Sequence, residues 1–441
     1  MIDIPPSIVR QPPPPRRPGK EERNTELEPF KLPVQPVHQI IREKTNLRTY
    51  YPRRCERNSL TNIESSSLTT DIGSLPDELL FEVLARIPGQ QDIYEARLVC
   101  RKWYLIIHTR NFMSAYLRHS PYGLLLKSLR WESLLILPQR GGGVEMTRLR
   151  YKRRCMVTSS CNGLWLETNM KSEHELFVTN PTTGQIVRLP PFVGKVAEGR
   201  YAMGYAPDSM EYKVVIYNPL VGTCARPLTC HILTAGVDTK WRNLDLGVIS
   251  SEKAMTALFN PTLITEGFIH WNHPITQHVF TLNVETETIT ETPAPLPLKL
   301  FPALGDQASI YLSTGKYLTL LSHYGECSWQ VWEMSRLETG EWRKKVDFCL
   351  EVHKERFKLS GVVAKVFLIP VGWVKYPELL AMRGSYKANM TAVFLYNLVT
   401  QEIDEIGLPS YVFQYNFVVH KSSLEWLDAV KVKPTRRLVS K

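Results

Sequence analysis

The histidines that could bind a metal ion gather in one short stretch of the chain. His270, His273 and His278 lie in the segment HWNHPITQH, where a turn could bring two imidazoles together. No cysteine lies near them, and the acidic residues closest in sequence are Glu266 and Glu285. A zinc site needs at least three protein ligands in a compact arrangement. We therefore predict no metal site.

Other motifs that carry chemistry are missing or incomplete. The glycines at 141–143 are not followed by Lys-Ser or Lys-Thr, so they do not form a phosphate-binding loop. The sequence contains no Gly-x-Ser-x-Gly motif and no Cys-x-x-Cys pair. Cys161 lies in the stretch Ser-Cys-Asn-Gly, where a small buried residue is a better interpretation than a reactive thiol. We predict a protein without catalytic residues or cofactors, with reduced thiols.

Residues 74–117 carry the pattern of several short helices. Ser74 and Asp77 fit a capping box with a proline in the first turn. Apolar residues then recur at helical spacing until Pro88-Gly89 ends the helix. A second capping box at Asp92 precedes another apolar run, and Asn111 is expected to cap a last helix. About 45 residues can enclose only a small core, so this unit should need a partner for stability.

From residue 121 the pattern changes to short strands, and a degenerate repeat runs through it. Five segments place Thr or Asp three residues before Ile or Trp, with steps of 55, 48, 53 and 61 residues between them. The pairs are Thr183/Ile186, Asp238/Trp241, Thr286/Ile289, Thr339/Trp342 and Thr400/Ile403. A period near 50 residues is typical of kelch-like propeller blades, and about 300 residues allow six of them. A pair of β-sandwiches is the alternative.

The two ends of the chain differ from its middle. Eleven of the 31 prolines precede residue 53, so residues 1–72 are predicted to form a disordered arm. The net charge of +11 comes almost wholly from residues 140–154 and from a basic tail at 429–441. A nucleic-acid-binding domain would more often show a basic stripe interleaved with stacking aromatics, so nucleic-acid binding is not favoured. The longest apolar window, Val362–Val374, is too short to cross a membrane.

The helical segment resembles an F-box. Its motifs are Leu75-Pro76, Ile87-Pro88, Val99-Cys100-Arg101-Lys102-Trp103 and Phe112, in the order and spacing of that family. The stretch QQDIYEARL departs from the Leu-rich turn that is usual in plant F-boxes. The following residues resemble the F-box-associated domain abundant in plants, in SSCNGLWLE (159–167), NPTTGQIVRLP (180–190), GFIHWN (267–272) and FVVHKSSLEWL (417–427).

This resemblance implies an α+β multidomain protein. Its parts would be the arm (1–72), an F-box (73–120), an all-β, six-bladed, kelch-like propeller (121–428) and the basic tail. The implied function is that of a non-catalytic substrate receptor in an SCF-type (Skp–cullin–F-box) ubiquitin ligase. The F-box would bind a Skp-type adaptor, and cullin through it. The propeller would hold a target protein that the sequence does not identify.

The residues that the resemblance places at the adaptor are Leu75, Pro76, Leu79, Ile87, Pro88, Val99, Cys100 and Trp103. Some of them, Val99 and Cys100 above all, could instead be internal core. A propeller enzyme and a basic nucleic-acid-binding protein are the alternative functions. The expected location is the cytoplasm, the nucleus or both, because the cysteine usage fits a reducing compartment.

Overall fold

The computed structural model describes one helical module and one ring of β-sheets. The described residues are 75–87, 90–128, 133–139, 143–149, 151, 155–169, 172–192, 200–218, 229–246, 262–272, 278–295, 309–324, 327–353, 368–386, 390–407 and 415–425. The chain divides into residues 1–69 and 70–441, and all described residues belong to the second unit. The predicted arm and basic tail lie outside the described residues. None of the described helices is long and apolar enough to cross a membrane.

Four short helices form the module. They are α1 (Asp77–Ala85), α2 (Gln90–Ala96), α3 (Arg101–Ile107) and α4 (Arg110–His119). The three predicted caps are wrong. Asp92 lies inside α2, in its first turn, and does not precede the helix. Pro76 is the N-cap of α1, where no side chain caps the helix. Thr109, and not Asn111, caps α4, because its hydroxyl accepts a hydrogen bond from the Phe112 N–H at 3.2 Å.

Six four-stranded antiparallel sheets follow, which we call blades 1 to 6. The strands of each blade are named in order from the axis of the ring outward. Blade 1 contains β24 (Tyr415–Lys421), β1 (Tyr122–Ser128), β2 (Ser133–Pro138) and β3 (Val144–Arg148); blade 2 contains β4 (Cys155–Cys161), β5 (Leu164–Asn169), β6 (Ser172–Thr179) and β7 (Ile186–Arg188). Blade 3 contains β8 (Tyr201–Ala206), β9 (Glu211–Asn218), β10 (Thr229–Thr234) and β11 (Arg242–Asn243); blade 4 contains β12 (Leu263–Thr265), β13 (Phe268–Asn272), β14 (His278–Asn283) and β15 (Thr288–Pro293). Blade 5 contains β16 (Ser309–Ser313), β17 (Leu318–Tyr324), β18 (Ser328–Arg336) and β19 (Glu341–Cys349); blade 6 contains β20 (Leu368–Lys375), β21 (Leu379–Tyr386), β22 (Met390–Asn397) and β23 (Ile403–Ile406).

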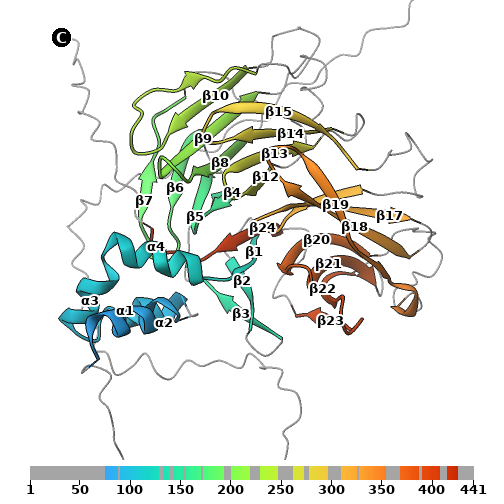
Figure 1. Ribbon diagram of the computed structural model, residues 1–441, viewed down its shortest axis with the longest axis horizontal. Coiled ribbons are helices and arrows are strands. Elements are labelled where there is room, and N and C mark those ends of the chain that lie inside the picture. The colour runs from blue at the N-terminus through green and yellow to red at the C-terminus, as the bar shows by residue number, and fades with distance from the viewer. Residues whose placement is uncertain are drawn as a thin grey trace, which may run out of the picture. The chain divides into compact units, whose positions relative to one another are not determined.

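The blades succeed one another around a ring, and the last strand closes it (Figure 1). β24 pairs antiparallel with β1, from Tyr122 opposite Lys421 to Ser128 opposite Tyr415. Blade 1 therefore combines strands from the beginning and the end of the propeller sequence. This pairing covers the edge of β1 and holds the last part of the ring to the first blade. The six-bladed propeller is confirmed, and the sandwich alternative is wrong.

The sequence repeat corresponds to the turn that leads into the outermost strand of blades 2 to 6. In each turn an N–H donates to the carbonyl four residues earlier, at 2.8–2.9 Å; the pairs are Gly184/Asn180, Asp238/Thr234, Glu287/Asn283, Gly340/Arg336 and Gln401/Asn397. In blades 2, 4 and 6 the first residue is an asparagine whose side-chain oxygen accepts from the N–H groups two and three residues later. A fixed hydrogen-bonding pattern therefore keeps the spacing while most residue types vary.

The hydrophobic core lies between neighbouring blades. Trp241 and Trp342, which follow the repeated turns in blades 3 and 5, each donate an indole N–H to a proline carbonyl of the preceding blade. Trp373 of blade 6 is buried and donates to the Thr319 hydroxyl of blade 5 at 3.0 Å. These bonds satisfy the indole N–H groups at blade junctions. Trp241 and Trp342, which are members of the sequence repeat, therefore pack between blades.

Candidate functional site

The helical module separates its apolar side chains into a core and an exposed set. Its core contains Leu80, Leu84, Ile93, Phe112 and Tyr116. The exposed set consists of Leu79, Val83, Leu98, Val99, Tyr104 and Leu105. Six of the thirteen large apolar side chains that are exposed among the described residues thus lie in this one small module. Such a concentration marks a surface that a partner covers.

The predicted site residues fall into two groups. Pro76, Leu79, Val99 and Cys100 are exposed, with Leu79 at 54% and Val99 at 63%. The core alternative for Val99 and Cys100 is therefore wrong, although their adaptor contact stays a prediction.

The second group lies nearer the core. Leu75, Ile87 and Trp103 are half-buried and pack against the core cluster, so their substitution would also disturb the fold. Pro88 lies outside the described residues.

A lysine brings the two halves of the exposed set together. The Lys102 ammonium donates to the Leu75 carbonyl at 3.0 Å and pairs with the Asp77 carboxylate at 2.8 Å. Lys102 lies in the first turn of α3, for which Cys100 is the N-cap. The start of α3 is therefore held against the start of α1, which carries Leu79. This places the exposed residues of both segments on neighbouring parts of the module.

Sequence reasoning missed four members of the exposed set: Val83, Leu98, Tyr104 and Leu105. The helical spacing of apolar residues before Pro88 includes Leu79 and Val83 together with Leu80 and Leu84. Residues four apart share one side of a helix, and the pairs 79/83 and 80/84 lie about 100° apart. The first pair is exposed and the second is buried. The apolar side chains of α1 cover a wider part of the helix than one small core can bury. This width was the sequence signal that could have revealed the exposed residues.

The C-terminal end of the ring completes the core of the helical module. Leu424, three residues after β24, is buried in the same cluster as Leu80 and Phe112. The Asn180 side-chain amide of blade 2 donates to the carbonyls of Ser423 at 3.2 Å and Glu425 at 2.9 Å. Asn180 also caps the turn of blade 2, so this clamp is a second role of the same side chain, and the sequence did not indicate it.

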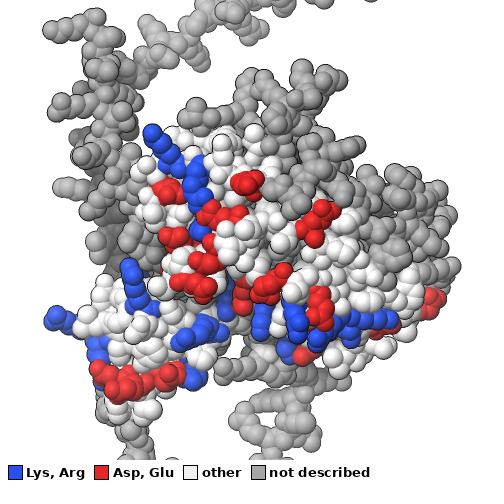
Figure 2. Space-filling model, turned by 45° about the horizontal axis from the view of Figure 1, so that its top comes forward, with Lys and Arg blue, Asp and Glu red and all other residues white. Residues whose placement is uncertain are grey.

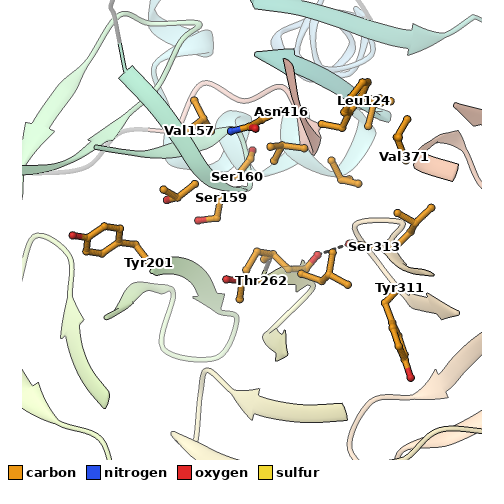
Figure 3. Close-up of a pocket in the computed structure, with 18 of the residues that line it drawn as sticks. Leu124, Val157, Ser159, Ser160, Tyr201, Thr262, Tyr311, Ser313, Val371 and Asn416 are labelled. Atoms are coloured by element: carbon orange, nitrogen blue, oxygen red, sulfur yellow. Dashed lines mark hydrogen bonds between the residues drawn. The ribbon is translucent and has the colours of Figure 1, made fainter. Parts of the chain in front are cut away.

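Two adjoining cavities lie along the axis of the ring. The larger, of about 530 Å³, is lined by the inner strands of all six blades. Figure 3 shows Val157, Ser159 and Ser160 on one side of it and Thr262 and Ser313 on the other. The smaller, of about 300 Å³, lies where the inner strands end and is also lined by Leu117 and Arg118 of α4. We call the larger cavity the channel and the smaller one the α4-side mouth.

The histidines of the candidate metal stretch have other roles. His270 is buried, and its ring nitrogens bond to the hydroxyls of Thr265 at 2.8 Å and Thr281 at 2.9 Å. Burial lowers the pKa of His270 to about 3. His278 pairs with Glu291 at 3.0 Å, and His273 lies outside the described residues. No group of three metal-ligating side chains occurs among the described residues.

Cys161 is buried at the end of β4, and burial raises its thiol pKa to about 12. A thiol with that pKa is protonated at neutral pH, and it is the thiolate that acts as nucleophile. The interpretation of Cys161 as a small buried residue is therefore confirmed, although it ends a strand instead of beginning one.

The surface charge of the ring is locally balanced. Acidic and basic side chains adjoin one another on the face shown in Figure 2. Arg242 and Lys213 of blade 3 both pair with Glu287 of blade 4, and the hydrogen bond from Arg242 is the main cause that lowers the Glu287 pKa to about 2. Lys345 pairs with Glu333 at 2.8 Å within blade 5. The pairs of Glu287 therefore link two blades, and the Lys345 pair joins neighbouring strands of one blade.

Comparison with known proteins connects this architecture to a family. Residues 139–421 match the F-box associated beta propeller domain, and residues 72–116 match the F-box-like domain. An F-box protein of Arabidopsis thaliana is 23% identical over 279 residues, which cover 60% of this chain and 77% of the relative. A putative F-box/kelch-repeat protein of that plant is 29% identical over 161 residues, 32% of this chain and 38% of the relative.

Among solved structures, a chain of a nidogen/laminin complex is 11% identical, with a TM-score of 0.39 over 70% of this chain and 99% of that one. This score is too low to support any inference. The propeller match covers well over half of the chain and coincides with the observed ring. The chain therefore belongs to the family with an F-box associated beta propeller domain, here preceded by an F-box.

Proposed function

We propose that this chain is the target-recognition subunit of an SCF-type ubiquitin ligase. The F-box binds a Skp-type adaptor and through it cullin, and the propeller holds a target protein. Other subunits carry out the transfer of ubiquitin. The chain contributes proximity, because it turns an encounter between target and ligase into an event within one assembly.

The observation that carries this proposal is the exposed apolar set of the helical module. A unit of four short helices has little core, yet it leaves Leu79, Val99 and four further large apolar side chains in solvent. Burial of such side chains contributes roughly 1.5–3 kcal/mol each. A protein partner that covers them gains this free energy. The match to an F-box over residues 72–116 indicates which kind of partner this is.

The direct test is the double variant Leu79→Ser and Val99→Ser. Both side chains are exposed, so the variant should fold normally. Truncation of apolar residues at an interface centre costs about 1–4 kcal/mol each, so affinity for a purified Skp-type adaptor should fall at least about tenfold. The matched control is Val237→Ser with Val399→Ser, which changes equally exposed valines on blades 3 and 6. Unchanged adaptor affinity in the first variant would contradict the proposal.

The target can be sought with the same variant. If the propeller binds the target and the F-box delivers it, the variant should retain targets that the wild type releases to degradation. Proximity labelling should therefore enrich these proteins around the variant. Equal labelling by wild type and variant, with adaptor binding abolished, would speak against a role in target turnover.

A further inference from the structure

The channel and the α4-side mouth adjoin each other and together make up the space along the axis of the ring. They share Ser160, Ile264 and Val419 as lining residues. Their volumes, about 530 and 300 Å³, lie in the range of sites for small organic molecules. The channel and the mouth differ in polarity and charge. This difference predicts which kind of ligand the space can bind.

The channel wall combines aliphatic side chains with hydroxyl groups, several of which already have protein partners. The Ser159 hydroxyl accepts from the Met203 N–H at 3.0 Å, and the Ser160 hydroxyl bonds to His420 at 2.8 Å. The Ser313 hydroxyl donates to the Ile264 carbonyl. The aliphatic part of the wall includes Leu124, Val371 and Val419, and an apolar ligand body can lie along it. Among the lining residues described, none is acidic and Arg200 alone is basic.

The mouth contains a half-buried lysine, Lys421, which interacts electrostatically with the Glu266 carboxylate but forms no ion pair with it. The Lys421 ammonium lies 4.7 Å from the centre of the Tyr122 ring, and no ion pair joins it to any described residue. Burial lowers its pKa, which reflects the free-energy cost of keeping this charge away from water. A cation–π contact offsets part of this cost. An anion beside the ammonium would offset more of it.

The charges around the mouth set the charge of the ligand. Arg118 and Lys421 are the basic lining residues described, and Glu266 is the acidic one. Glu266 already accepts a hydrogen bond from the Tyr122 hydroxyl at 2.9 Å. Two positive charges and one negative charge leave a net charge of +1. This balance favours a monoanion over a doubly charged group such as a phosphate monoester.

We propose that this space binds a small amphipathic acid, with its carboxylate at Lys421 and its apolar body along the channel. The site is separate from the exposed apolar set that is proposed to bind the adaptor. It is lined by residues of α4 and of the ring, so a bound ligand contacts both parts of the protein.

The test uses calorimetric titration of the full chain with decanoate, decanol and decylamine. Decanoate should bind at least about tenfold more tightly than decanol, because a hydrogen bond to a charged group is worth that factor. Decylamine should bind more weakly than decanol. Within the series from hexanoate to decanoate, each added CH₂ should strengthen binding roughly fourfold. Equal affinity for decanoate and decanol, or no binding of either, would overturn the proposal.

Two variants locate the ligand. Lys421→Met keeps most of the side-chain stem and should reduce decanoate affinity to the level of decanol. Lys240→Met, at an exposed lysine between β10 and β11, is the matched control and should change nothing. Val371→Phe narrows the channel. In this variant decanoate should bind no more tightly than hexanoate, while hexanoate still binds. Two results would show that the acid binds elsewhere. One is that Val371→Phe keeps the wild-type increase in affinity from hexanoate to decanoate, and the other is that both lysine variants change decanoate affinity equally.

Discussion

Replacing Leu424 by Ala should loosen the helical module, although this residue follows the last strand of the ring. Leu424 is 6% exposed and packs in one cluster with Leu80, Phe112 and Tyr116. The module therefore depends on a side chain from the other end of the folded chain. A module with a self-contained core would not respond to this substitution.

The size of the effect follows from burial. A buried Leu→Ala substitution costs about 2–5 kcal/mol, because it loses transfer free energy and leaves a cavity. A unit of about 45 residues has a stability of roughly 2–7 kcal/mol at typical values per residue. The substitution thus removes a large part of the free energy that keeps the four helices closed. The ring should remain folded, since its blades bury far more apolar surface.

Hydrogen exchange of the native protein measures this directly. Amide protons of α1 to α4 should exchange about 30-fold faster or more in Leu424→Ala, while peptides from blades 3 to 5 keep their rates. The matched control is Leu244→Ala, at a leucine that is 7% exposed and packs between blades 3 and 4. This control should accelerate exchange in the ring and not in the helices. Unchanged exchange of the helices in Leu424→Ala, or the same profile in both variants, would refute the reasoning.

Two further substitutions test buried groups of the ring. The unfolded chain takes up a proton at His270 near pH 6.5 but the native chain only near pH 3, so stability should fall as pH drops through this window, by about 1.4 kcal/mol per pH unit. Urea unfolding between pH 7 and 5 should show a flatter slope for His270→Gln, and an unchanged slope would contradict this assignment. Gly163→Ala should lower the melting temperature more than Gly184→Ala. Both glycines have positive φ, so both substitutions introduce backbone strain. The new Cβ at position 163 would also lie 2.7 Å from the Ser423 nitrogen, whereas the Cβ at position 184 would lie in open space. Equal losses of melting temperature in the two variants would show that backbone strain, and not the contact with Ser423, causes both losses.

The repeat could be predicted from sequence because local hydrogen bonds fix it. Asn180, Asn283 and Asn397 each begin a turn of constant length, and the residue that starts or precedes the outermost strand follows at constant spacing. Blade 1 has no such asparagine, since its outer connection reads Pro-Gln-Arg-Gly-Gly-Gly-Val at 138–144. Five repeats were therefore visible for six blades. The count of six came from length and not from a sixth motif.

Features that depend on distant pairing were not visible. β24 joins β1 across almost the whole ring, and no local pattern in residues 415–421 identifies this partner. The membership of Leu424 in the helical core is equally hidden, because a lone leucine after a strand has many possible neighbours. The charge environment of Lys421 is a third case, since Tyr122 and Glu266 reach it only after the ring has closed.

These hidden features converge on one short segment. Residues 415–425 close the ring through β24, supply Lys421 to the α4-side mouth, and place Leu424 in the helical core. A receptor that acts by proximity needs a defined geometry between the surface that binds the ligase and the surface that holds the target. The Asn180 clamp and the Leu424 contact restrict motion between module and ring more than a flexible linker would. Loss of these contacts should therefore reduce delivery of a target even where each binding surface remains intact.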